Sequence, residues 1–281
     1  METRSAATRM AAGDDIRNFY GSGPADVQRA WDRRSCSAVL ETALALRIMR
    51  SHLPSPPARI YDIGGGNGYF AFALSDIGYE VSLSDLTPAL IMDARVRDAE
   101  RGSVLRDATV ADARSLPYPD ESGDAALYFG PFYGLPDQQE RHIALRELAR
   151  VLRPGAVVMV DSLTTIGTLR GLAIADPGVI ARVDVDRLLS TGVVVGDGLP
   201  AFFQGHVSTH PEDASAELAG AGFEVVETIG IDGPHPYVQP RLRDCPQAVV
   251  DAWADLALQI GRDPRNWNSA NHVVHVARRP A

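Results

Sequence analysis

The residues with the strongest chemical signature lie in the stretch IYDIGGGNGYFA, residues 60 to 71. Four glycines fall within five positions shortly after the acid Asp62. Glycine allows main-chain conformations that are closed to other residues, and it lets a ligand pass within van der Waals contact of the backbone. The spaced glycines Gly64, Gly66 and Gly68 exceed what a tight turn between a strand and a helix requires. They therefore predict a ligand-binding loop.

Two kinds of ligand fit such a loop. A dinucleotide fits formally, because Gly66-x-Gly68-x-x-Ala71 matches the pattern G-x-G-x-x-G/A and the acid Asp85 follows. Asp62 argues against it, since a carboxylate at the strand end would face a pyrophosphate with no counter-charge. A ligand that is neutral or cationic at this point fits better, and a nicotinamide-dependent oxidoreductase remains the alternative.

A loop of this kind needs a strand before it and a helix after it. From residue 58 onward, short apolar runs alternate with helical patterns, which is typical of parallel strands joined by helical crossovers. The predicted crossover helices cover 69–74, 88–101 and 138–152, with a short one near Arg114. The seven predicted strands are RIYDI, EVSLSD, ATVAD, AALYFG, AVVMVDS, FEVVETIGI and HVVHVAR. The predicted fold is therefore α/β, with a doubly wound, seven-stranded and mostly parallel sheet.

Composition and charge limit the kinds of partner that the chain can bind. The 281-residue chain has a formal net charge of −9 and no basic run longer than two arginines, which argues against nucleic acid binding. Cys36 and Cys245 have no ligand-spaced neighbours, so neither a disulfide nor a metal site is predicted. No signal-like or membrane-spanning apolar stretch occurs, so we expect no membrane association and a cytoplasmic location.

Four motifs in a fixed order carry a family resemblance. They are DIGGGNG, SLSDLTP, ADARSLPYPDESGDAALYFGPFYGL and ALRELARVLRPGAVVMVDS. Together they resemble the class I S-adenosylmethionine-dependent methyltransferases, and most of all the bacterial small-molecule group of type 11. The resemblance runs from about residue 17 to the C-terminus. It implies a Rossmann-like methyltransferase fold and S-adenosylmethionine as the cofactor.

The resemblance implies roles for the residues that match these motifs. Gly64 and Gly66 would pass against the methionine and ribose of the cofactor, and Asp62 would hold the methionine amine. Asp85 would accept hydrogen bonds from both ribose hydroxyls, a role that a carboxylate at a strand end can also take on physical grounds. The following Thr87-Pro88 makes a helix cap or turn the alternative role for Asp85.

The remaining implied cofactor residues are Tyr20, Leu86, Asp112, Ala113, Phe129 and Gly130. Asp112 would accept from the exocyclic amine of adenine, with a polar loop residue as the alternative. Gly130 would admit the acceptor next to the reactive methyl group. Tyr20 lies in the segment that folds over the cofactor in such enzymes, although plain packing is its alternative role.

The sequence also predicts how the chain divides into parts. Residues 1–14 are predicted to be a disordered leader, and residues 15–57 a helical segment that covers the cofactor site. Residues 58–281 would form the methyltransferase domain. An amphipathic insertion at about 163–205 is predicted to form a lid over the carboxyl ends of the strands, where open α/β sheets bind ligands.

Methyl transfer from a sulfonium is an in-line displacement that needs a nucleophile held about 3 Å from the methyl carbon and the exclusion of water. A base accelerates the reaction when the nucleophile is a hydroxyl or an ammonium group. The predicted catalytic residues are Tyr133, Asp161 and His210, and His206 and His235 are further candidates near the strand ends. Helix capping or lid packing is the alternative role for His210.

The sequence thus predicts an S-adenosylmethionine-dependent methyltransferase with a small-molecule acceptor, for which specialised metabolism is a candidate setting. Methylation of oxygen or nitrogen is expected ahead of carbon. We expect a monomer or a homodimer. Two other classes remain open, the nicotinamide-dependent oxidoreductase and a protein that binds S-adenosylmethionine without methylating.

Overall fold

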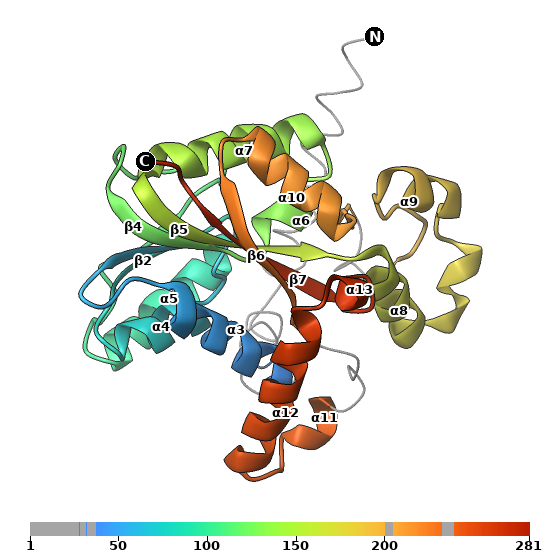
Figure 1. Cartoon of the computed structure of the whole chain (residues 1–281), viewed down its shortest axis with the longest axis horizontal. Helices are drawn as coiled ribbons and strands as arrows, with labels where there is room; N and C mark the ends of the chain where they lie inside the picture. Colours follow the sequence, from blue (N-terminus) through green and yellow to red (C-terminus); the bar gives the residue numbers. More distant parts are fainter. Residues whose placement is uncertain (1–27, 29–31, 33–37, 200–204, 232–238) are drawn as a thin grey trace.

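The computed structural model describes residues 28, 32, 38–199, 205–231 and 239–281. This part of the chain forms a seven-stranded sheet with helices on both faces (Figure 1). The strand order is β3-β2-β1-β4-β5-β7-β6. The strands are β1 (Arg59–Ile63), β2 (Glu80–Asp85), β3 (Asp107–Val110), β4 (Gly123–Tyr128), β5 (Leu152–Leu163), β6 (Glu224–Gly230) and β7 (His272–Arg278).

The direction of the strands fixes where a ligand can bind. Strands β1 to β5 pair in parallel, and only β7 runs antiparallel to its neighbours β5 and β6. The predicted mostly parallel, doubly wound sheet is therefore confirmed. The chain builds outward from β1 through β2 to β3 and then returns to β4 on the other side of β1. This switch point, at the carboxyl ends of β1 and β4, is the usual ligand site of open α/β sheets.

Both faces of the sheet are buried because successive strand residues point to opposite sides. Ile60 and Leu127 belong to the core on one face, whereas Tyr61 and Ala126 belong to the core on the other. The helices on the first face are α3 (Val39–His52), α4 (Tyr69–Ser75), α5 (Pro88–Glu100) and α12 (Gln247–Gly261). The helices on the second face are α7 (Gln138–Val151) and α10 (Pro211–Gly220).

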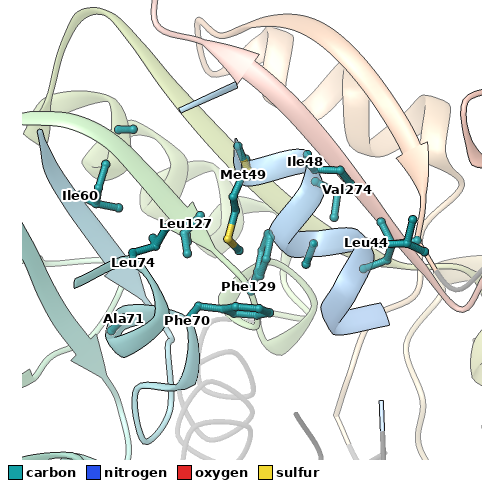
Figure 2. Close-up of a cluster of buried hydrophobic side chains, with 14 of the residues drawn as sticks. Leu44, Ile48, Met49, Ile60, Phe70, Ala71, Leu74, Leu127, Phe129 and Val274 are labelled. Carbon is teal, nitrogen blue, oxygen red and sulfur yellow. The ribbon is translucent and has the colours of Figure 1, made fainter. Parts of the chain in front are cut away.

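Helix α3 is the described helix of the segment 15–57 that was expected to cover the cofactor. Figure 2 shows its side chains Leu44, Ile48 and Met49 beside Phe129 of the sheet end and Val274 of β7. Helix α3 therefore forms part of the core beneath the sheet. Residues 1–14 and most of 15–37, with Tyr20, lie outside the described residues.

The insertion after β5 forms a small unit with its own core. Its helices are α8 (Thr165–Ala175), the 3-10 helix η2 (Pro177–Ala181) and α9 (Val185–Thr191). They enclose the buried residues Leu172, Val179, Val183, Leu188 and Val194. In Figure 1 this unit lies at one end of the sheet, past the carboxyl end of β5. Its role as a lid stays a prediction.

Residues 205–209, which we call the return strap, lead from the insertion back to the domain. On one edge the main chain of the strap bonds Gly192 and Val194 of the insertion. On the other edge it bonds the carbonyl oxygens of Tyr133 and Leu163. The strap is thus held between the insertion and the sheet, and its side chains are fixed relative to both.

Two features of the fold differ from the sequence prediction. The connection from β3 to β4 contains turns and no helix, so the prediction of a short helix near Arg114 is wrong. Pro117 and Pro119 explain this, because each lacks an amide hydrogen and disfavours the helical conformation of its predecessor. Helix α12 was not predicted. Among the described helices, none is both long and apolar enough to cross a membrane.

Short elements complete the described chain. They are α6 (Pro131–Gly134), α11 (Gln239–Leu242) and α13 (Pro264–Trp267). Helix α6 matters for the site, because it follows β4 directly and begins at the switch point of the sheet.

Candidate functional site

A cavity of about 180 Å³ lies at the carboxyl ends of β1, β2 and β4. The sequence-predicted residues among its lining are Asp62, Gly64, Gly66, Asp85, Leu86, Asp112, Ala113, Phe129, Gly130 and Tyr133. His206 lines it as well. Every predicted cofactor residue in the described part of the chain thus meets in one cavity, and Tyr20 falls outside that part.

Glycine is required at positions 64 and 66 of the loop after β1 for different physical reasons. A Cβ on Gly64 would lie 2.4 Å from Cδ of Pro131, so Gly64 is needed for packing against α6. A Cβ on Gly66 would meet only a Leu90 methyl carbon at 3.9 Å. Gly66 has a φ of +60°, which other residues rarely adopt. Gly66 is therefore where a ligand can approach the main chain closely.

Asp62 and Asp85 present carboxylates to the two sides of this loop. Asp62 is buried at the end of β1, and a Cβ on Gly65 would lie 2.4 Å from its Oδ2. Asp85 accepts from the amide of Gly66 at 2.9 Å and from the amide of Thr87 at 2.8 Å. Burial raises the pKa of Asp85, and these hydrogen bonds oppose the rise.

The turn role and the ribose role of Asp85 are compatible in this geometry. Each carboxylate oxygen accepts one main-chain hydrogen bond, Oδ2 from Gly66 and Oδ1 from Thr87. A carboxylate offers about four acceptor positions. These two bonds therefore leave acceptor capacity on the side chain for a further donor.

Asp112 is held by an arginine that was not predicted to take part. Arg114 donates to Asp112 from Nε at 2.9 Å and to Glu140 of α7 from its terminal nitrogen at 2.5 Å. Hydrogen bonding to Asp112 raises the pKa of Arg114, so the guanidinium stays charged. The signal in the sequence was the local pattern Asp-x-Arg. The ion pair fixes the cavity wall that also contains Ala113.

Tyr133 and His206 line the other end of the cavity, and His272 and Asp161 lie outside its lining; we call these four residues the tyrosine–histidine cluster. The ring of Tyr133 contacts His206 at 5.4 Å between centroids and His272 at 6.1 Å, both nearly perpendicular. Nδ1 of His272 lies 2.9 Å from Oδ2 of Asp161. All four residues are buried.

The hydroxyl of Tyr133 points toward Gly130. It lies 4.0 Å from the position that a Cβ would take on Gly130, which has a φ of +125°. The open space beside Gly130 therefore adjoins the tyrosine–histidine cluster on one side and the glycine loop on the other.

The three predicted catalytic residues lie at different places. Tyr133 lines the cavity. Asp161 lies behind it, bonded to His272 and outside the lining. His210 is exposed at the start of α10 and lines a separate cleft between α7, α9 and α10. His206 lines the cavity in place of His210, because the return strap crosses it four residues earlier.

His272 was missed by sequence reasoning, and His235 lies outside the described residues. His272 follows Asp161 by 111 residues and begins a strand with an ordinary apolar pattern. No local signal marks it. Only the antiparallel pairing of β5 with β7 brings the two side chains together.

Comparisons with known proteins identify the family of this chain. Residues 61–160 match a family model described as a methyltransferase domain. The chain is 30% identical over 236 residues to a demethylmenaquinone methyltransferase of Thermus thermophilus, which covers 79% of this chain and 94% of that protein. The chain therefore belongs to the S-adenosylmethionine-dependent methyltransferases.

Two further similarities extend this result. A ubiquinone/menaquinone biosynthesis C-methyltransferase of Laribacter hongkongensis is 32% identical over 116 residues, or 40% of this chain and 46% of that protein. The crystal structure of an S-adenosylmethionine-dependent methyltransferase from Methanosarcina mazei has a TM-score of 0.57 at 20% identity. It covers 83% of this chain and 97% of that one, which supports the fold.

The protein is thus an S-adenosylmethionine-dependent methyltransferase, and S-adenosylmethionine is its cofactor. The residues of the cavity fit that group. Gly66 leaves room for close approach, Asp85 retains acceptor capacity, and Leu86, Leu90 and Ala113 supply apolar surface. The family gives no support to the nicotinamide alternative.

Proposed function

We propose that the protein methylates a small-molecule acceptor that reacts through an ionisable hydroxyl, and that His206 removes the hydroxyl proton. One observation carries this proposal. Tyr133 and His206 line the same cavity as the glycine loop and Gly130, and both side chains are buried. A base and a positioning hydroxyl therefore adjoin the space in which the methyl group would be transferred.

The cofactor would occupy the end of the cavity near β1 and β2. Asp85 would accept from the ribose hydroxyls with its remaining lone pairs. Asp62 would bind the methionine amine, and Gly64 and Gly66 would lie against the methionine and ribose. Asp112, Ala113 and Leu86 would surround the adenine. Phe129 and Gly130 would lie beside the sulfonium.

The protein itself then has to place the acceptor and take up one proton. S-adenosylmethionine supplies an electrophilic methyl group on a sulfonium. Gly130 leaves space for the acceptor oxygen, and His206 takes up the proton as that oxygen becomes nucleophilic. Burial of Tyr133 and His206 excludes water from this end. Such a base contributes roughly 10²- to 10⁴-fold.

The atom that receives the methyl group depends on the acceptor. We expected oxygen or nitrogen from the sequence, whereas two relatives are named for methylation of quinones, one of them at carbon. A deprotonated aromatic hydroxyl carries negative charge on oxygen and on its ring carbons. His206 can remove the hydroxyl proton before methylation at either atom; after transfer to carbon, the ring carbon must lose its own proton and the oxygen regain one, which restores the aromatic ring. An aromatic hydroxyl acceptor is therefore consistent both with the sequence expectation and with the names of these relatives.

The first experiment measures binding and then transfer. Titration calorimetry with S-adenosylmethionine and its demethylated product should show binding to wild-type protein. Catechol, 1,4-naphthohydroquinone and benzylamine are then offered as acceptors, and mass spectrometry detects the gain of one methyl group. Product NMR separates O-methyl from C-methyl. Transfer to benzylamine alone would contradict the hydroxyl proposal.

The second experiment tests the base. The His206→Gln variant should transfer the methyl group about 10²-fold more slowly or worse at neutral pH, and cofactor affinity should change little. Raising the pH should recover part of the rate, because the hydroxyl then ionises without help. His210→Gln is the matched control, since His210 is exposed outside the cavity. Equal loss in both variants would refute the assignment.

A further inference from the structure

Asp161 and His272 form a buried pair directly behind the cavity. Asp161 ends the apolar part of β5 and is 1% exposed, and His272 begins β7 and is 6% exposed. Neither residue lines the cavity. Any effect of this pair on methyl transfer must therefore pass through a residue that does.

The hydrogen bond between them fixes the imidazole. Nδ1 of His272 lies 2.9 Å and 3.1 Å from the two carboxylate oxygens of Asp161. An ionised carboxylate only accepts hydrogen bonds, so Nδ1 is the donor. This bond sets both the tautomer and the orientation of the ring, as partners of this kind do for other functional histidines.

The fixed imidazole in turn contacts Tyr133. The two ring planes meet at 75°, and the ring of Tyr133 also meets the ring of His206 at 73°. Perpendicular ring contacts of this kind are directional. Tyr133 thus contacts an imidazole from β7 and an imidazole from the return strap, with its hydroxyl toward Gly130.

We propose that Asp161 and His272 are positioning residues, which hold the ring of Tyr133 so that its hydroxyl stays beside Gly130 where the acceptor meets the methyl group. This inference rests on the proposed function for its effect on transfer. The contact itself does not, and it can be tested without any acceptor.

A purely structural role would not need these residue types. Burial of a carboxylate and an imidazole costs free energy that an apolar pair of similar size avoids. Replacing both partners together by apolar groups is often nearly neutral for stability. The Asp161→Leu/His272→Phe double variant therefore keeps a ring against Tyr133 but removes the hydrogen bond that orients it.

The test compares this double variant with Asp161→Asn and with a matched control. The control is Glu227→Gln, which alters another carboxylate–histidine contact, between Glu227 and His52 at 2.8 Å. That contact involves no residue of the cavity. Calorimetry should find S-adenosylmethionine affinity within about threefold of wild type in all variants.

The acceptor-independent readout is NMR. Each protein is labelled with 3-fluorotyrosine, and the Tyr133 signal among the eight tyrosines is assigned with Tyr133→Phe. We expect this signal to shift and broaden in Asp161→Asn and in the double variant, but not in the control. Nitrogen-15 spectra should show the Nδ1-protonated form of His272 in wild type and its loss in Asp161→Asn. An unchanged Tyr133 signal would overturn the proposal.

The functional readout is methylation of 1,4-naphthohydroquinone. The turnover number should fall about 10- to 100-fold in Asp161→Asn and in the double variant, since small misplacements at a reacting centre have effects of this size. Full activity in the double variant would overturn the proposal, because ring packing alone would then suffice. If wild type methylates none of the three probes, the proposed function fails, while the NMR result still decides the positioning role.

Discussion

The Asp85 carboxylate shows how one side chain organises its surroundings and keeps capacity for a ligand. It holds Gly66 of the glycine loop and Thr87 before α5 in place. A ribose bound to the same side chain would therefore meet a carboxylate that is already oriented. The turn role and the ribose role of Asp85 were alternatives at the level of sequence, which could not reveal that acceptor capacity remains once the turn bonds have formed.

Asp85→Asn should weaken S-adenosylmethionine binding by about 10- to 100-fold, because hydrogen bonds to a charged acceptor contribute about 1.5–3 kcal/mol. Titration calorimetry measures the change. Asp107→Asn serves as the control, since Asp107 also accepts a hydrogen bond at the sheet, from Ser82, but does not line the cavity. Unchanged affinity in Asp85→Asn would refute the ribose role.

Gly130→Ala should abolish most methyl transfer. The new methyl group would enter the space between Gly64 and the Tyr133 hydroxyl, and the φ of +125° would add strain. Gly102→Ala is a matched control, because Gly102 also has a positive φ but no heavy atom within 4 Å of its Cβ position. Mass spectrometry of product formation should separate the two variants by about 100-fold or more. Comparable activity would contradict the placement of the acceptor.

At the scale of elements, the sequence predicted strands best where turn residues bound them on both sides. RIYDI, EVSLSD and HVVHVAR match β1, β2 and β7 residue for residue. The prediction of a helix near Arg114 was wrong because two nearby prolines disfavour a helix more strongly than the short apolar pattern favours one. Helix α12 was not predicted, although Pro246 directly before it is a residue that often stands at the start of a helix. Local pattern thus predicts elements, whereas contacts between β5 and β7 depend on topology.

His275 links several elements and should make the fold sensitive to acid. It lies on β7 within hydrogen-bonding distance of Ser162 on β5, Ser215 on α10 and Thr228 on β6. Burial lowers its pKa to about 4. The unfolded chain, with an ordinary pKa near 6.5, therefore binds the proton more readily between these two values.

The contribution of His275 to the free energy of unfolding should therefore be complete above pH 6.5 and should decline as the pH falls toward 4. The loss attributable to His275 is about 3 kcal/mol over this window. Denaturant titrations at several pH values measure it. His275→Gln should flatten the decline, and the exposed His210→Gln should not. Identical pH profiles for His275→Gln and wild type would contradict this expectation.

At the scale of the whole molecule, the insertion and the cavity are joined through the return strap. None of the described residues 165–199 lines the cavity, yet the insertion holds the main chain that carries His206. The sequence predicted the insertion at this place and assigned it to a lid. The sequence named His206 only as a further candidate near the strand ends, because its place at the cavity depends on a main-chain bond from Val207 to Tyr133, 74 residues earlier in the chain.

Gly192→Ala should therefore slow methyl transfer without loss of cofactor binding. A Cβ at Gly192 would lie 1.9 Å from the carbonyl oxygen of Ser208, so the strap would have to move. Gly155→Ala is the control, since it has a similar positive φ and no heavy atom within 4 Å. We expect a rate decrease of about tenfold or more, measured as product formation. Equal rates in the two variants would show that the strap position does not matter.

The contact between Gly64 and Pro131 has a consequence for redesign of this enzyme. Cδ of the proline ring occupies the place that any side chain at position 64 would need, so the first turn after β1 and the start of α6 share one volume. A substitution at Pro131 that enlarges the cavity would therefore also free the glycine loop after β1. Substrate range and cofactor affinity should therefore change together in variants of Pro131. Positions 64 and 131 should accordingly be varied as a pair.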